Sequence, residues 1–180
     1  MEKLNVLDET GSIVGQEYRD VIHQKGLLHA EVHVWCTTPE DEIIFQQRAK
    51  DKDTYPDLLD ATAGGHVDLG ETYEIAAMKE LVEETGIIAT SDELLYLNTQ
   101  ITKQYDHVTG LINHARRNIY LLTNKVPVNE LQIEEGAGAG FVSYPIDQMF
   151  TLSPDEQYKF VPSIVDESGL ELFAKLKERI

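Results

Sequence analysis

Three closely spaced glutamates are the most chemically suggestive feature of the 180-residue sequence. Glu80, Glu83 and Glu84 lie at i, i+3 and i+4, so a helix would carry all three carboxylates on one face. Like charges at this spacing repel one another, and Mg²⁺ or Mn²⁺, which prefer oxygen ligands, would relieve the repulsion. The spacing therefore predicts a metal site. A solvated acidic helix face is the alternative in a chain of net charge −17.

Glycines flank the predicted helix and complete a longer pattern. Gly65 precedes the helix and Gly86 follows it; with Glu71 and the three glutamates they fit the spacing G-x5-E-x8-E-x2-E-E-x-G. Six residue types at fixed positions should match by chance in a chain of this length with a probability of roughly 10⁻⁵. The added residues favour a functional helix over a solvated acidic face.

The segment over residues 65–87 closely resembles the Nudix box, G-x5-E-x7-R-E-U-x-E-E-x-G-U, in which U is a bulky aliphatic residue. Leu81 and Ile87 occupy the two aliphatic positions, and Lys79 stands where the family usually has arginine. In the family that arginine pairs with the glutamate matched here by Glu71. Lysine keeps the charge but lacks the bidentate geometry of a guanidinium group.

The resemblance implies a metal-dependent hydrolase of diphosphates that are linked to another group, often a nucleoside. Bound Mg²⁺ or Mn²⁺ would neutralise the substrate and lower the pKa of the attacking water, and a carboxylate would take the proton. Glu83 is the preferred candidate for that base. The residues implied as catalytic are Glu80, Glu83, Glu84 and Glu135, and those implied as metal ligands are the same four with the backbone carbonyl of Gly64.

A glycine-rich stretch in the second half of the chain supplies the last of these carboxylates. Residues 134–140 read Glu-Glu-Gly-Ala-Gly-Ala-Gly and precede a strand-like segment. Alternating glycines allow a loop to approach a ligand closely. Glu135 resembles the loop glutamate that often completes such sites in the family; a surface loop with incidental charge is the alternative.

Residues 19–56 carry a second pattern, which resembles the Nudix branch that includes type I isopentenyl diphosphate isomerase. An arginine and a lysine four residues apart follow a strand-like segment and precede Tyr-Pro. In that branch the two cations hold the substrate diphosphate, which implies this role for Arg48 and Lys52. Gly65 and His66 are implied as further substrate contacts. Two solvated basic residues, and a surface or supporting histidine, are the alternatives.

Two departures from the isomerases favour hydrolysis over isomerisation. The isomerases carry a catalytic cysteine in a Cys-Ser-His run, whereas residues 63–66 here read Ala-Gly-Gly-His. They also break the Nudix box, which this chain keeps. The single cysteine, Cys36, lies in a strand-like run and is expected to be a buried small hydrophobe. An isoprenoid-diphosphate isomerase and a non-catalytic nucleotide-binding sensor remain the two alternatives to a hydrolase.

Other ionisable residues keep open roles. His29 and His33 share one face of a predicted strand, where they could line a substrate cleft or be half-buried. Arg116 and Arg117 are adjacent in a predicted strand and face opposite ways, so one of them could reach the substrate. The remaining histidines lack a spacing that would make a zinc site: His23, His107 and His114.

The elements that must position these residues alternate between strands and helices. The helix is predicted over residues 71–85, with an apolar stripe of Ile75, Met78, Leu81 and Val82. Strands are predicted over residues 5–7, 13–15, 32–36, 43–47, 94–102, 111–122 and 141–143, the sixth of them bulged. A helix starts after Ser153, and another spans residues 166–180, where Gly169 is a weak spot and Leu170, Phe173, Ala174 and Leu176 form the stripe.

This alternation predicts an α/β fold with a mixed central sheet between helical layers, in agreement with the α/β/α sandwich implied by the resemblance. The chain is expected to form one Nudix domain over residues 1–180, with the box at residues 65–87 and a helical extension at about residues 153–180. Homodimers are common in the family, so a homodimer is an expected assembly.

Composition bounds the partners. Hydrophobic residues make up 42% of the chain, which is typical of a globular protein. The sequence holds no apolar run of about 20 residues and no signal-peptide pattern, so no membrane is expected as a partner. A single cysteine fits a reducing cytoplasm, and 32 acidic against 15 basic residues oppose binding to long nucleic acids. A small diphosphate substrate is compatible with this charge, because bound metal inverts the local field.

Overall fold

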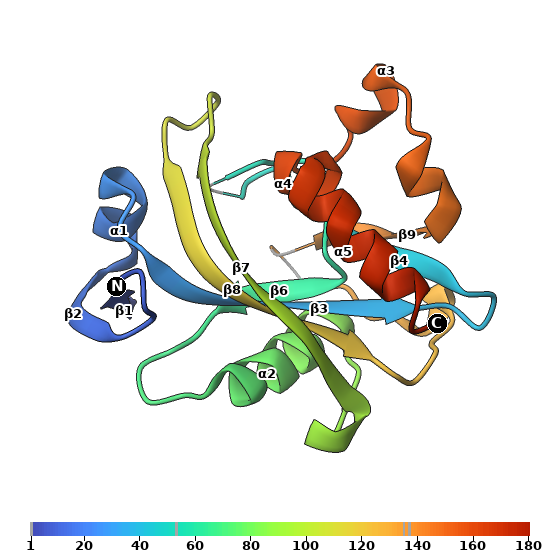
Figure 1. Cartoon of the computed structure of the whole chain (residues 1–180), viewed down its shortest axis with the longest axis horizontal. Coiled ribbons are helices and arrows are strands. Elements are labelled where there is room, and N and C mark those ends of the chain that lie inside the picture. The colour runs from blue at the N-terminus through green and yellow to red at the C-terminus, as the bar shows by residue number, and fades with distance from the viewer. Residues whose placement is uncertain (1, 53, 135, 137) are drawn as a thin grey trace.

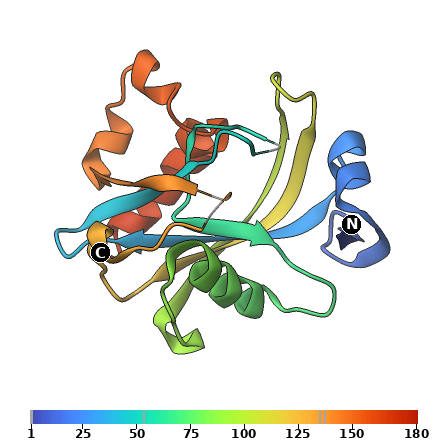
Figure 2. The same ribbon diagram turned by 180° about the vertical axis from the view of Figure 1, so that it is seen from behind.

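The chain folds around a β-sheet, seen from opposite sides in Figures 1 and 2. A computed structural model describes residues 2–52, 54–134, 136 and 138–180. Its strands are β1 (Lys3–Leu7), β2 (Ile13–Tyr18), β3 (His29–Thr37), β4 (Glu42–Arg48), β5 (Leu59–Asp60), β6 (Ala63–His66), β7 (Leu94–Tyr105), β8 (Ile112–Leu122) and β9 (Gly138–Pro145). Its α-helices are α1 (Arg19–Lys25), α2 (Tyr73–Thr85), α3 (Pro154–Gln157), α4 (Pro162–Val165) and α5 (Glu167–Lys177), and 3₁₀ turns span Ser91–Glu93, Val128–Glu130 and Ile146–Phe150.

β3 is the central strand of the sheet. β1, β4 and β6 run antiparallel to it, and β8 runs parallel to it from His29 to Trp35. β2 continues the sheet beyond β1, β7 continues it beyond β8, and β5 and β9 both pair with β4. Both strand directions therefore occur in one sheet, as predicted.

Helices cover both faces of this sheet. Alternate β3 residues point to opposite sides: Val32 and Val34 pack with Leu81 of α2, whereas Trp35 packs with Phe173 of α5. Figure 1 shows α2 below the sheet and α5 above it, and Figure 2 shows the same layers from behind. The predicted α/β/α sandwich with a mixed central sheet is confirmed.

The helix of the predicted metal site begins two residues later than expected. Thr72 is its N-cap, and the Thr72 side chain accepts a hydrogen bond from the Ile75 N–H, so Glu71 lies before the helix. Gly86 ends it in the left-handed region, at φ 75°, where its N–H donates to the Val82 carbonyl. The predicted glycine C-cap is thus confirmed, because a residue without Cβ adopts this conformation freely.

The apolar stripe of α2 differs from the predicted one. Leu81 is buried as expected, but Ile75 and Val82 are 48% and 42% exposed. Ala76 and Ala77 occupy the buried face instead. Small side chains let the helix approach the sheet closely. The helix therefore buries its alanine face rather than the face that carries Ile75 and Val82.

The irregularity predicted in the strand over residues 111–122 lies in its neighbour instead. β8 is regular, and the register shift falls between Tyr96 and Asn98 of β7. An extra residue on either partner disturbs the same ladder, so the alternation of one strand does not show which of the two is bulged.

The two predicted carboxy-terminal helices are present, and each begins at a side-chain N-cap. Ser153 caps α3 as predicted. Asp166 caps α5, whose buried residues include Leu172, Phe173 and Leu176, while Ala174 of the predicted stripe is exposed.

Among the described residues, no helix combines the length and apolar character needed to cross a membrane.

Gly169 was expected to weaken α5, but the fold requires a glycine there. A Cβ at residue 169 would lie 2.2 Å from the Ile164 carbonyl oxygen, which belongs to the backbone of α4. Gly169→Ala should therefore lower the free energy of unfolding by about 1–3 kcal/mol, despite the higher helix propensity of alanine. Chemical denaturation measures this. Gly15→Ala is the control, because a Cβ there meets nothing within 4 Å; equal stability of the two variants would contradict the packing argument.

Candidate active site

A cavity of about 540 Å³ opens where α2, β6, β3, β8 and the loop after β4 meet. It brings together every predicted site residue that the structure describes: Arg48, Lys52, Gly64, Gly65, His66, Glu80, Glu83 and Glu84. Glu135 lies outside the described residues, and its neighbour Glu134 lines the cavity. Residues separated by more than 30 positions in the sequence thus share one site.

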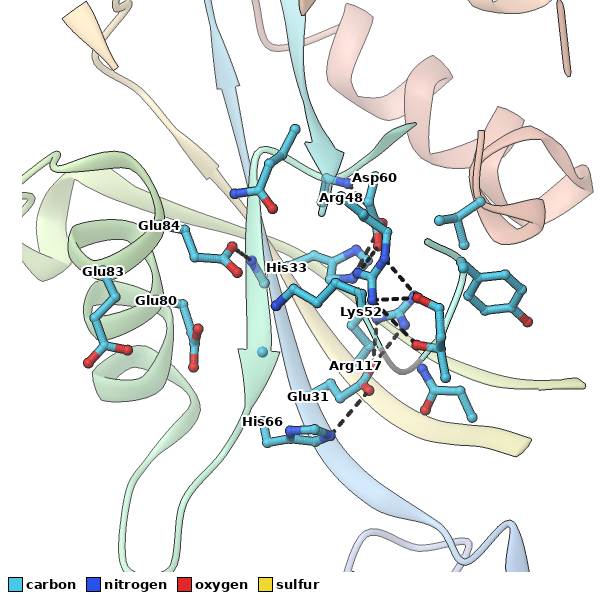
Figure 3. Close-up of a pocket in the computed structure, with 18 of the residues that line it drawn as sticks. Glu31, His33, Arg48, Lys52, Asp60, His66, Glu80, Glu83, Glu84 and Arg117 are labelled. Atoms are coloured by element: carbon cyan, nitrogen blue, oxygen red, sulfur yellow. Dashed lines mark hydrogen bonds and ion pairs between the residues drawn. The ribbon is translucent and has the colours of Figure 1, made fainter. Parts of the chain in front are cut away.

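The three glutamates occupy one side of this cavity at different depths. Glu84 is buried and accepts a hydrogen bond of 2.9 Å from the Gly64 N–H, while Glu83 is exposed. Glu80 lies against β6, where a Cβ at Gly65 would come within 2.4 Å of its carboxylate. The glycine pair therefore lets the backbone of β6 and the carboxylates of α2 approach each other (Figure 3).

Lys79 and Lys52 only partly offset the cost of ionising Glu80 and Glu84 on this acidic side. Burial, and then repulsion from Glu84, raise the pKa of Glu80 to about 8. Burial raises the pKa of Glu84 to about 7, against the opposing effect of its hydrogen bond to Gly64. Carboxylate and carbonyl oxygens are suitable ligands for Mg²⁺ or Mn²⁺. A divalent cation bound here would remove the electrostatic cost of ionising both glutamates.

Basic residues face the glutamates across the cavity (Figure 3). Arg48 donates from Nη1 to Asp60 at 3.0 Å, and from Nε and Nη2 to the Thr54 carbonyl at 3.1 and 2.9 Å. Lys52 extends from the loop after β4 towards the gap between Arg48 and the glutamate helix. This loop follows β4 directly, which explains why an arginine and a lysine four residues apart both reach the cavity.

The structure also shows which arginine of β8 lines the cavity. Arg117 does, and its Nη2 and Nε donate to Glu31 at 2.7 and 3.2 Å. Burial alone would raise the pKa of Glu31, but the Arg117 guanidinium holds it well below its ordinary value. Arg116 points to the opposite face of the sheet, as its neighbouring position predicts. The sequence identified this pair but not its orientation.

His66 belongs to a cluster that sequence spacing did not indicate. His23, His29 and His66 each place a ring nitrogen within 4.8 Å of the others. Glu31 adjoins the cluster, with Oε1 at 3.3 Å from His29 Nε2 and 3.9 Å from His66 Nε2. Imidazole nitrogens suit zinc, copper, iron and nickel ions, so this group could also hold a metal. The spacing of His23 in the sequence gave no sign of this cluster, because α1, β3 and β6 bring the three histidines together only in the fold.

His33 lies apart from that cluster. Its Nε2 is 4.0 Å from Asp60, and burial lowers its pKa to about 4. It lines the same cavity as a neutral side chain. The two strand histidines left open by the sequence thus have different surroundings, although they share one face of β3.

The lysine in place of the family arginine has two acidic neighbours. Lys79 pairs with Asp68, and its Nζ lies 4.0 Å from Glu71. The Glu71 carboxylate also accepts a hydrogen bond of 3.3 Å from the Asp68 N–H. The brace between the box loop and the helix is therefore shared among three side chains, and Asp68 is a partner that the motif did not indicate.

Cys36 is buried, as expected. Its surroundings are the apolar residues between the sheet and α2, and burial raises the pKa of its thiol to about 12. A thiol with this pKa is protonated at neutral pH and is a poor nucleophile. It offers no replacement for the cysteine that the isomerases use.

A sandwich whose glutamate helix faces basic residues across one cavity defines a class of proteins with a charged site suited to anionic ligands. The NUDIX domain family model matches residues 27–164. An uncharacterized Nudix hydrolase of Clostridium acetobutylicum is 32% identical over 151 residues, which cover 82% of this chain and 72% of that protein. The chain therefore belongs to the Nudix family, and the predicted class of pyrophosphohydrolase is confirmed.

Solved structures agree with the fold. A Deinococcus radiodurans protein of known crystal structure superposes with a TM-score of 0.70 at 20% identity, covering 97% of this chain and 99% of that one. The NUDIX domain of Shewanella oneidensis NrtR, solved with ADP-ribose, has a TM-score of 0.57 at 16% identity, covering 84% and 88%. The chain spans about half the length of several other curated Nudix hydrolases, between 47% and 57%.

Proposed function

We propose that the protein hydrolyses a diphosphate bond in a small molecule with the help of Mg²⁺ or Mn²⁺, and that the substrate is a nucleoside diphosphate or a derivative of one. The observation that supports this most directly is the division of one cavity into an acidic side, with Glu80, Glu83 and Glu84, and a basic side, with Arg48 and Lys52. A diphosphate needs both: metal held by carboxylates, and cations for its remaining oxygens.

Each residue of the site has a proposed part. Glu80, Glu83, Glu84, the Gly64 carbonyl and the loop carboxylate Glu135 would hold the metal, which when bound neutralises phosphate charge and acidifies water. Arg48 and Lys52 would bind the diphosphate, with Arg117 beside them, and Gly65 and His66 would contact it from β6. Glu83, the exposed member of the three, would take the proton of the attacking water.

A second cavity adjoins the first and offers room for a leaving group. It has a volume of about 390 Å³ and shares Glu2, Arg19, His23 and Thr54 with the first. Asp20 and Gln24 of α1 also line it. Their side-chain oxygens can accept hydrogen bonds from a sugar or a base, which an isoprenoid tail could not donate. These acceptors are compatible with a sugar or a base, while most of the exposed surface of this cavity is apolar, so the substrate panel below has to decide between a nucleoside and an isoprenoid chain.

We also propose that residues 1–180 act as one domain and that the protein works in the cytoplasm. The two apolar cores share the strands β3, β4 and β8, which supports a single folding unit. The single cysteine is buried and free, so the fold does not depend on an oxidising compartment in which a disulfide would form.

Phosphate release tests the function. Purified protein should release phosphate or a nucleotide from one class in a panel of nucleoside di- and triphosphates, nucleotide sugars, ADP-ribose, dinucleotides and isoprenoid diphosphates. Mg²⁺ or Mn²⁺ should be required, and EDTA should reduce turnover to background, because no cation then neutralises the diphosphate or acidifies the attacking water. Full turnover in EDTA would contradict the proposal. Metal-dependent nucleotide binding without products would instead support the sensor.

A further inference from the structure

The loop that carries Lys52 into the cavity has an unusual backbone. Tyr55 and Asp57 have φ values of 47° and 66°, in the left-handed region that residues with a side chain rarely adopt. Such conformations cost free energy and persist only where the surrounding contacts fix them. Contacts between this loop and the rest of the protein therefore determine where Lys52 lies.

One set of these contacts comes from β4. The Arg48 guanidinium donates to the Thr54 carbonyl, and the Arg48 N–H donates to the Leu58 carbonyl at 2.9 Å. Gln47 Nε2 donates to Asp57 Oδ1 at 3.0 Å. These contacts join the two ends of the loop, and the Arg48 guanidinium bonds hold the carbonyl end of the peptide group whose other end is the Tyr55 N–H.

The contact to Tyr55 comes from the tip of the β7–β8 hairpin, 51 residues along the chain. The Tyr55 N–H donates to Asp106 Oδ2 at 3.0 Å. Asp106 is 3% exposed and is fixed by its own turn, where it accepts from the Val108 N–H and the Thr109 hydroxyl at 2.9 Å each. A buried charged acceptor held from three sides makes a strong and well-oriented hydrogen bond.

We propose that Asp106 is a positioning residue, which holds the Tyr55 N–H and thereby keeps the loop in the conformation that presents Lys52 to the substrate diphosphate. This inference rests on the proposed function for the role of Lys52. It places a determinant of substrate binding in a hairpin tip whose carboxylate contacts the loop backbone and need not touch the substrate.

A double-mutant cycle tests the coupling. Lys52→Ala and Asp106→Ala should each raise KM about tenfold, the size expected for one charge-assisted hydrogen bond, with little change in kcat. The double variant should show the same KM as Lys52→Ala alone, because Asp106 acts through Lys52. Asp106→Asn keeps one acceptor oxygen and should lie between the wild type and Asp106→Ala.

Asp8→Ala is the matched control. Asp8 caps the turn of the β1–β2 hairpin with the same kind of bonds, from Thr10 and Ser12, and it is absent from the lining of the cavity. This variant should leave KM unchanged. If Asp8→Ala and Asp106→Ala raised KM equally, the effect would be general destabilisation and the inference would be overturned.

Hydrogen exchange provides a readout that does not depend on turnover. Asp106→Ala should accelerate amide exchange in the segment around Tyr55, and Asp8→Ala should not. Unchanged exchange there would overturn the inference even if no substrate were known. A KM that responds to Asp106→Ala but not to Lys52→Ala would instead contradict the proposed role of Lys52, so the two failures are distinguishable.

Discussion

Replacement of Glu83 by glutamine is expected to lower kcat by about 10²–10⁴-fold, the usual contribution of a general base. Glu83 is exposed, so the isosteric change should leave the melting temperature close to that of the wild type. Steady-state kinetics at saturating Mg²⁺ measures the loss, and circular dichroism checks the fold. A kcat within a few-fold of the wild type would exclude Glu83 as the base.

Glu84→Gln should combine a similar loss of turnover with a gain in stability. The amide oxygen can still accept the hydrogen bond from the Gly64 N–H, while the cost of a buried charge disappears. The metal-free variant should therefore melt at a higher temperature than the metal-free wild type at pH 8. Glu74→Gln is the matched control, since Glu74 is an exposed glutamate of the same helix outside the cavity. Equal effects of the two substitutions would contradict the argument.

The glutamate helix could be recognised from the sequence because of its residue spacing. Spacings of three and four residues bring side chains together within a single helix, so no knowledge of the tertiary fold is needed. Gly65, which lies within β6, makes room for Glu80 of α2, so this part of the motif depends on the packing of a strand against the helix. The glutamate spacing itself is readable because it is local to one helix.

The rest of the site depends on pairings that sequence distance conceals. Asp106 meets Tyr55 across 51 positions, and the histidine cluster joins α1, β3 and β6. Arg117 could be paired with the cavity only once the parallel alignment of β8 with β3 was known. Strand register sets which side of the sheet Arg117 and His29 face, and a shift of one residue would reverse it, whereas the Asp106–Tyr55 contact joins a hairpin turn to a loop. Residue types alone do not determine that register.

The stability of the metal-free protein should fall as the pH rises from 6.5 to 8. Glu80 and Glu84 have pKa values of about 8 and 7 in the fold and 4.5 as ordinary side chains. Between these values the unfolded chain is ionised while the folded protein keeps its protons, so each glutamate lowers the free energy of unfolding by up to about 1.4 kcal/mol per pH unit. The melting temperature should drop by roughly 5 °C over this range.

Two buried histidines act in the opposite direction over part of this range. Burial lowers the pKa of His33 and His66 to about 4 and 3, so the unfolded chain loses protons as the pH rises through 6.5, and this small gain in stability partly offsets the fall caused by the two glutamates. Saturating Mg²⁺ should raise the melting temperature more at pH 8 than at pH 6.5, because ionised carboxylates bind the cation and neutral ones do not. Differential scanning fluorimetry with EDTA or Mg²⁺ measures both trends. The double variant Glu80→Gln/Glu84→Gln should lose both the fall in stability with pH and the response to Mg²⁺, and a wild-type profile equal to that of the double variant would show that these carboxylates are not the titrating groups.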